Sequence, residues 1–121
     1  MMKLRITNQN TGLELATAAW NADTLFSRLK GLLGTEGLPD GQGLLITPCN
    51  SVHMIGMKYA IDVVFLDEKL AVHKTVSCLR PYSFAVCRQA VAALEIPAGT
   101  IAATKTQVGH MLQVAEYLPK E

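Results

Sequence analysis

Short apolar segments separated by turn residues dominate this sequence, and the pattern leaves little room for helices. The strongest segment, residues 63–66, is apolar on four consecutive residues, which is typical of a strand buried on both faces. A turn at Asp67-Glu68-Lys69 leads into a second segment at residues 70–76, so the two are expected to form a hairpin. Short strands at regular spacing with few helices indicate a mainly β fold, either a β-sandwich or a β-barrel.

The remaining strands are placed by alternation of apolar and polar residues. An N-terminal hairpin is expected from residues 3–7 and 13–18, because the residues between them have turn chemistry. Further strands are expected at residues 44–47 and after Gly109, and the segment from Val52 to Ile61 favours a strand over a helix. Residues 90–96 are compatible with a helix by their alanines or with a strand by their end.

One helix stands out, at about residues 24–33, where apolar residues follow a period of 3.6. Asp23 is a suitable N-cap and Gly34 a suitable C-terminal stop. Arg28 flanks the apolar stripe, which places its guanidinium at the rim of the surface that the helix covers. Residues 100–106 are compatible with a short second helix.

The length of the chain predicts its number of domains, and its net charge argues against some classes of partner. With 121 residues, the chain is expected to form a single domain, 1–121, with a proper core. The formal net charge of +1 supplies no field that would attract nucleic acid or an anionic membrane, so neither is expected as a partner. The apolar runs are far shorter than the ~18 residues of a membrane-spanning helix, and no signal sequence is recognisable.

The cysteines point to a reducing compartment. There are three, an odd number without C-x-x-C spacing, which is unlike a disulfide-stapled secreted domain. We therefore expect reduced thiols and a cytoplasmic location.

Cys49 and His53 are spaced as C-x3-H, which on a helix would put both on one face as ligands for a metal. Pro48 and Gly56 argue against a helix, and on a strand the two side chains would lie ~13 Å apart. We expect no metal site. No phosphate-binding glycine loop, dinucleotide fingerprint or G-x-S-x-G motif is present, and no cofactor is expected.

Lys58 and Asp62 border the most apolar strand, where a charge is costly unless it is paired or exposed. They could form an exposed salt bridge of under ~1 kcal/mol. Alternatively, they belong to a polar site at one end of the sandwich, where loops often carry function. Both interpretations stay open on these residues alone.

Three motifs follow one another in the chain: Arg28-x-x-Gly31-Leu32-Leu33, the run HMIGMKYAIDVVFLD from His53 to Asp67, and Ala93-Leu94-Glu95-Ile96-Pro97-Ala98-Gly99 with Gly109 after a gap. In this order they resemble the uncharacterised DUF192 family, also called UPF0127, and they span nearly the whole chain. The match is to a shorter branch that carries Ser-Val-His ahead of Gly-Met-Lys. Gly56 stands where Trp is commoner, and His110 replaces the usual Asp.

The resemblance implies a mainly β, jelly-roll-like sandwich or partly closed barrel with one packed helix, and it implies no activity. It also marks the polar motif positions Arg28, Lys58, Asp62 and Glu95.

The leading hypothesis is a small ligand-binding or interaction module. Arg28 and Lys58 would meet a small anionic or polyhydroxylated ligand, because bidentate Arg contacts and a point-charge Lys suit carboxylates and phosphates. Asp62 would orient Lys58, and His53 would line the rim. The candidate site residues are thus Arg28, His53, Lys58, Asp62 and Glu95.

Two other hypotheses remain. A hydrolase or thiol-dependent enzyme would use His53 with Cys49 or Asp62. A purely structural domain would use Lys58–Asp62 and Arg28–Glu95 as ion pairs that close loops over the core.

Overall fold

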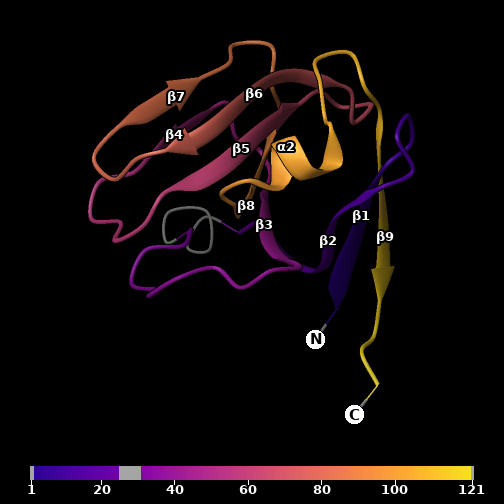
Figure 1. Ribbon diagram of the computed structural model, residues 1–121, viewed down its shortest axis with the longest axis horizontal. Helices are drawn as coiled ribbons and strands as arrows, with labels where there is room; N and C mark the ends of the chain where they lie inside the picture. Colours follow the sequence, from indigo (N-terminus) through magenta and orange to yellow (C-terminus); the bar gives the residue numbers. More distant parts are fainter. Residues whose placement is uncertain (1, 25–30, 121) are drawn as a thin grey trace.

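The computed structural model describes residues 2–24 and 31–120, which form nine strands and one short helix (Figure 1). The elements are β1 (Lys3–Asn8), β2 (Glu14–Ala22), β3 (Gln42–Ile46), β4 (Ser51–His53), β5 (Ile61–Leu66), β6 (Val72–Leu79), β7 (Phe84–Val86), β8 (Ala92–Pro97), α2 (Thr100–Thr104) and β9 (Leu112–Tyr117). The fold is mainly β, as the sequence predicts. No helix of the described residues is long and apolar enough to cross a membrane.

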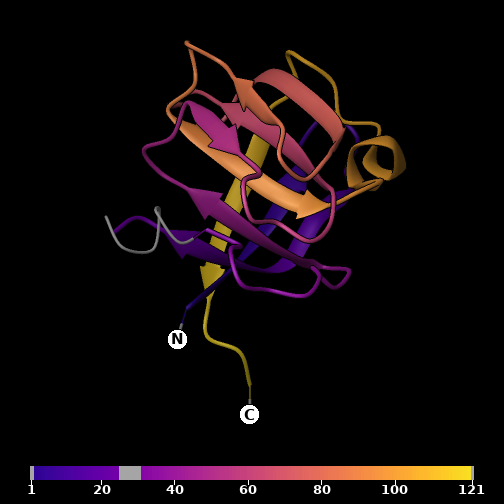
Figure 2. The same cartoon turned by 90° about the vertical axis from the view of Figure 1, so that its left-hand side faces the viewer.

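Seven strands form one mixed sheet in the order β6-β5-β8-β3-β2-β1-β9, and β4 and β7 form a separate antiparallel pair. Within the large sheet only β2 and β3 run parallel; the other neighbouring strands are antiparallel. The sheet curls, so that in Figure 2 β9 crosses behind β8 and β3. Its two edges meet at one end, where Ala71 bridges to Met111 and the Leu112 N–H donates to the Leu70 carbonyl at 2.9 Å. The sheet is therefore joined at one end without closing into a barrel.

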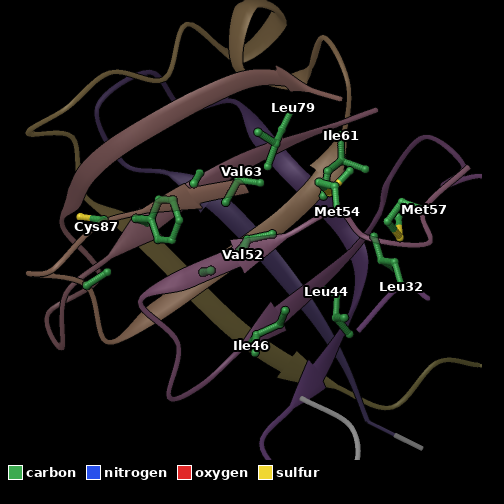
Figure 3. Close-up of a cluster of buried hydrophobic side chains, with 14 of the residues drawn as sticks. Leu32, Leu44, Ile46, Val52, Met54, Met57, Ile61, Val63, Leu79 and Cys87 are labelled. Atoms are coloured by element: carbon green, nitrogen blue, oxygen red, sulfur yellow. The ribbon is translucent and has the colours of Figure 1, made fainter. Parts of the chain in front are cut away.

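Alternation along β5 divides the core into two parts. Val63 and Phe65 belong to a cluster that the β4–β7 pair covers, which we call the pocket-face core (Figure 3). Val64 and Leu66 belong to a second cluster on the other face, together with Ile101 of α2, which we call the α2-face core. All six residues of β5 are buried, which confirms the prediction of a strand buried on both faces.

The N-terminal hairpin and the strands near residues 44–47, 70–76 and 112–117 are confirmed. For residues 90–96, strand is the outcome: β8 begins at Ala92, runs to Pro97 and lies between β5 and β3 in the sheet. The short helix near residues 100–106 is present as Thr100–Thr104. The helix expected at 24–33 falls largely on residues 25–30, which lie outside the described residues.

Of the strand favoured between Val52 and Ile61, only the two ends lie in strands, the first in β4 and Ile61 in β5. β4 ends at His53, and the chain then turns through Gly56, whose φ of 82° suits glycine. The short strand β7 was not predicted; its three residues, flanked by Pro81 and by the Cys87–Ala90 turn, are too few to show alternation.

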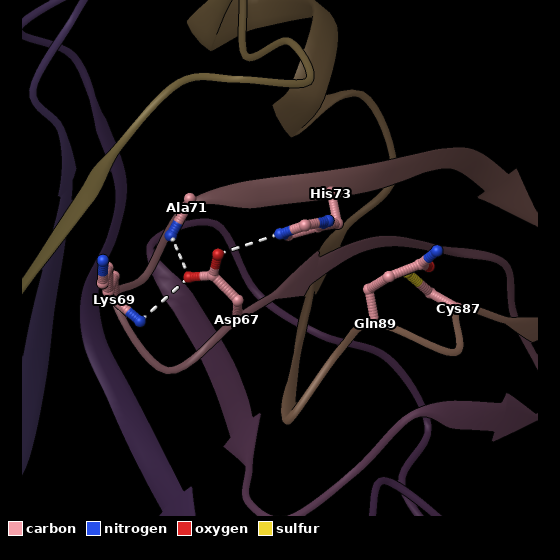
Figure 4. A network of polar contacts seen from close by, with 6 residues as sticks. All are labelled: Asp67, Lys69, Ala71, His73, Cys87 and Gln89. Carbon is pink, nitrogen blue, oxygen red and sulfur yellow. Dashed lines mark hydrogen bonds and ion pairs between the residues drawn. The ribbon is translucent and has the colours of Figure 1, made fainter.

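The turn between β5 and β6 is organised by Asp67 (Figure 4). Its Oδ1 accepts the backbone N–H groups of Lys69 and Ala71 at 2.9 and 3.0 Å, and its Oδ2 lies 2.8 Å from Nε2 of His73. The Ala71 hydrogen bond, followed by that of His73, holds the pKa of Asp67 below its ordinary value. Asp67 thus acts as a turn residue of this hairpin.

Candidate functional site

A pocket of about 310 Å³ opens beside β4 on the pocket-face core. Most of its lining is apolar, and several of the side chains involved are labelled in Figure 3. The lining residues are Gly31, Leu32, Leu33, Ile46, Pro48, Cys49, Asn50, Ser51, Val52, His53, Met54, Ile55, Met57 and Glu95. A mostly apolar hollow with a few polar groups is the usual form of a small-ligand site.

Glu95 is the buried charged group of this pocket. On β8 it lies opposite Leu44 of β3 and Val63 of β5, so its side chain emerges among apolar residues of the pocket-face core. The residue is only 6% exposed, and no described group donates a hydrogen bond to its carboxylate. Loss of hydration therefore raises the pKa of Glu95 to about 7.

Position 31 lies beside this carboxyl group. A Cβ atom there would lie 3.9 Å from Oε1 of Glu95, and the residue has a φ of 51°, which glycine adopts readily. The family-like Gly31 and Glu95 motifs, 64 positions apart in sequence (95 − 31), thus meet at one wall of the pocket.

Polar groups at the rim come from the segment that precedes and forms β4. Cys49, Asn50, Ser51 and His53 line the pocket, and the Cys49 thiol donates to the Ser51 carbonyl at 3.1 Å. His53 is exposed at the end of β4. Among the ionisable side chains of the described lining, Glu95 is the acid and no Lys or Arg is present.

Of the five predicted site residues, the four that the structure describes do not all converge. His53 and Glu95 line the same pocket. Lys58 pairs with the Glu36 carboxylate at 2.6 Å, with 58% and 80% of the two side chains exposed, so this ion pair contributes under ~1 kcal/mol. Arg28 lies outside the described residues.

Asp62 lies on the opposite face of the sheet from Glu95. It is fully buried, and its carboxylate accepts backbone N–H groups from Cys78 at 2.8 Å, Gly99 at 3.1 Å and Ile101 at 2.9 Å. The suggestion that Asp62 orients Lys58 is therefore not supported, because each group has other partners. Asp62 instead fixes the start of α2 and the end of β6 against β5.

The sequence analysis missed the apolar lining, above all Leu32, Met54 and Met57. The sequence names Glu95 as a candidate site residue and as an ion-pair partner of Arg28, but it does not predict a buried carboxyl group in an apolar pocket. A signal was available: Glu95 interrupts the apolar run Ala92–Ile96, where an unpaired carboxylate is costly. Within residues 2–24 and 31–120, no three His, Cys, Asp or Glu side chains gather closely enough to hold a metal ion.

Comparison with known proteins places the chain in a family and a fold. The model of the DUF192 family, described as uncharacterised, matches residues 5–114. A protein of unknown function from Novosphingobium aromaticivorans is 20% identical with a TM-score of 0.79, and the alignment covers 92% of this chain and 83% of that one. A candidate transcription regulator from Sinorhizobium meliloti is 17% identical with a TM-score of 0.81, covering 94% of each chain. No curated protein is similar enough in sequence to be matched. At these identities the structural likeness shows the fold alone.

Proposed function

Since the chain belongs to the DUF192 family, whose function is not established, we propose a function from the pocket itself: it binds a small ligand that has an apolar body and a cationic or hydrogen-bond-donating group. The observation that carries this proposal is the Glu95 carboxyl group. It is buried, has no hydrogen-bond donor among the described residues, and lines a pocket of about 310 Å³.

A buried carboxylate that receives no hydrogen bond from the described residues costs free energy, whereas Asp62, in a structural role, receives three. A ligand that donates to Glu95 would supply the missing partner. Leu32, Ile46 and Met54 would then cover the apolar part of the ligand.

The sequence-based hypothesis allowed an anionic or a polyhydroxylated ligand, and the described lining favours the polyhydroxylated one. An anionic ligand needs cations beside it, and Lys58 is paired with Glu36 and does not line the pocket. A hydroxylated ligand suits both protonation states of Glu95, because the acid donates and the carboxylate accepts. An ammonium group suits the ionised state best.

Binding of n-pentylamine, measured by NMR titration, tests this function. Because the ammonium needs ionised Glu95, we expect the affinity to rise about tenfold per pH unit between pH 5 and 7 and to level off above pH 7. Glu95→Gln should weaken binding at pH 8 at least fivefold.

The matched control variant is Glu116→Gln, an exposed carboxylate on β9, which should leave binding unchanged. The neutral analogue n-pentanol should bind without the rise in affinity between pH 5 and 7. Equal binding of the amine to the wild type and to Glu95→Gln would contradict the assigned role of Glu95.

A thiol-dependent activity is the second candidate, because Cys49 and His53 line the same pocket. Alkylation of Cys49 by iodoacetamide, followed against pH by mass spectrometry, tests it. A reactive thiolate would give a rate midpoint well below ~8.5, and His53→Ala would shift that midpoint. An ordinary midpoint that His53→Ala leaves in place would rule this candidate out.

A further inference from the structure

We infer that the ligand of this pocket is an extended peptide segment carrying a basic side chain, which adds as a third strand of the β4–β7 sheet along the edge of β4 that no described strand pairs. This inference rests on the proposed function and names the chemical class of the ligand. Four observations support it: an edge that no described strand pairs, the position of the pocket along that edge, the shape of its lining and its charge.

In β4, every second residue forms backbone hydrogen bonds with β7. The Cys87 N–H donates to the Asn50 carbonyl at 2.9 Å, and the Met54 N–H donates to the Ser83 carbonyl at 2.8 Å. Val52 lies between them, opposite Ala85. Because antiparallel pairing alternates, the N–H and C=O groups of Ser51 and His53 point away from β7.

No described strand pairs with this outer edge of β4. Among the described residues, the donor to the Ser51 carbonyl is the Cys49 thiol, a weak one. Ser51 and His53 thus offer donors and acceptors two residues apart, about 6.6 Å along the strand, which is the repeat that a further strand needs.

The pocket runs along this edge. Every residue from Pro48 to Ile55 lines it, and no residue of β7 does. Since consecutive side chains of a strand point to opposite faces, a hollow lined by all of them must lie beside the strand. Pairing of an added strand with an exposed edge is a common mode of peptide recognition.

The negative charge of the Glu95 carboxylate favours a basic side chain on the peptide. One face of an added strand would meet the apolar residues Ile46 and Met54, together with Glu95. A Lys side chain fits this combination, because its aliphatic stem lies against apolar groups while its ammonium reaches the carboxylate. An acidic side chain in the same place would meet the buried Glu95 carboxyl group and be rejected.

Amide hydrogen exchange with the peptide acetyl-Val-Lys-Val-amide tests the inference at pH 7.5. The Ser51 and His53 amides should exchange rapidly in the free protein and slow at least tenfold with peptide. The Val52 amide, already bonded to β7, is the internal control and should change little. Acetyl-Val-Glu-Val-amide should bind at least tenfold more weakly, and Glu95→Gln should lose that discrimination.

Methylation of single peptide nitrogens separates strand addition from other binding. A strand edge bonds alternate residues, so methylating one of two adjacent peptide amides should abolish binding, while methylating its neighbour should have little effect. Equal binding of both methylated peptides would overturn strand addition.

The outcomes also separate this inference from the proposed function. If n-pentylamine binds through Glu95 but the peptide neither binds nor protects Ser51 and His53, the peptide inference is wrong and the proposed function stands. If neither compound binds, both are wrong. Protection of the two amides that rises with protein concentration in the absence of peptide would assign the edge to a second copy of the chain, which also overturns the inference.

Discussion

Glu95 shows how the position of a residue on a central strand can raise its pKa. It lies on a central strand between Leu44 and Val63, on a face where Ala93 and its other neighbours are apolar. Sequence alone marks this residue through a family-like motif and through its place in an apolar run. Its raised pKa depends on β3 and β5, which come from 29 or more positions away in the chain (95 − 66), so no local pattern reveals it.

Glu95→Gln should make the protein more stable at pH 8 and leave stability nearly unchanged at pH 4. The pKa of Glu95 is raised from 4.5 to about 7, so folding binds a proton between these values. Wild-type stability therefore falls as pH rises from about 4.5 to about 7 and is level above, with a total loss of about 3 kcal/mol from this group. Urea unfolding of both proteins at several pH values measures the difference.

The exposed carboxylate of Glu116 provides the control, and Glu116→Gln should follow the wild type at every pH. A Glu95→Gln protein whose stability depends on pH as the wild type does would contradict the assignment of a raised pKa.

Asp62→Ala should destabilise the protein by about 3 kcal/mol, because it leaves the N–H groups of Cys78, Gly99 and Ile101 without their acceptor. Asp62→Asn keeps one acceptor oxygen and should cost less. Thermal unfolding at pH 7 gives both values, with Glu116→Ala as the surface control. A loss for Asp62→Ala no larger than that of the control would show that the three bonds contribute little.

At the scale of the elements, close approach of β3 and β8 requires Gly43. A Cβ atom there would lie 3.0 Å from the Glu95 carbonyl oxygen and 3.1 Å from Cγ2 of Ile96. Backbone cannot move as a flexible side chain does, so Gly43→Ala should cost about 1–3 kcal/mol in chemical unfolding. Gly37→Ala, with nothing within 4 Å of the added atom, should be close to neutral. Equal stabilities of the two variants would contradict this packing.

Most elements follow from local signals. Alternation and turn residues predict β1, β2, β5, β6 and β9, because each side chain's environment follows from its position on a pleated strand. The residues of β8 leave helix and strand open, since an alanine-rich apolar run suits either, and pairing with β3 and β5 decides for strand. β7 is held by pairing with β4, a contact that no local pattern of three residues reveals.

At the scale of the whole molecule, the two edges of the large sheet should behave as paired strands where they meet. The Val72 N–H donates to the His110 carbonyl, and the Gly109 N–H donates to the Val72 carbonyl, both at 2.9 Å. We expect the Val72, Gly109 and Leu112 amides to exchange at least a hundredfold more slowly than those of the exposed edge residues His73 and Ser77. If the Val72, Gly109 and Leu112 amides exchange as fast as those of His73 and Ser77, the two edges of the sheet are not paired.

The overall arrangement and the site depend on contacts between distant parts of the chain. The sequence predicts a mainly β sandwich or partly closed barrel, but the parallel pairing of β2 and β3 and the meeting of β6 with β9 have no local signature. The sequence places His53 and Glu95 in one candidate site together with Lys58 and Asp62, but the pocket that His53 and Glu95 share forms only when β4 packs over β8 and β3.

The most direct test of this account is a carbon-13 NMR titration of the Glu95 side-chain carboxyl group, recorded with and without n-pentylamine. We predict a midpoint near pH 7 in the free protein and a lower midpoint when the amine is bound, because a cation beside the carboxylate favours its ionised form. A midpoint near 4.5 that the amine leaves in place would contradict both the burial of this carboxyl group and its role in binding.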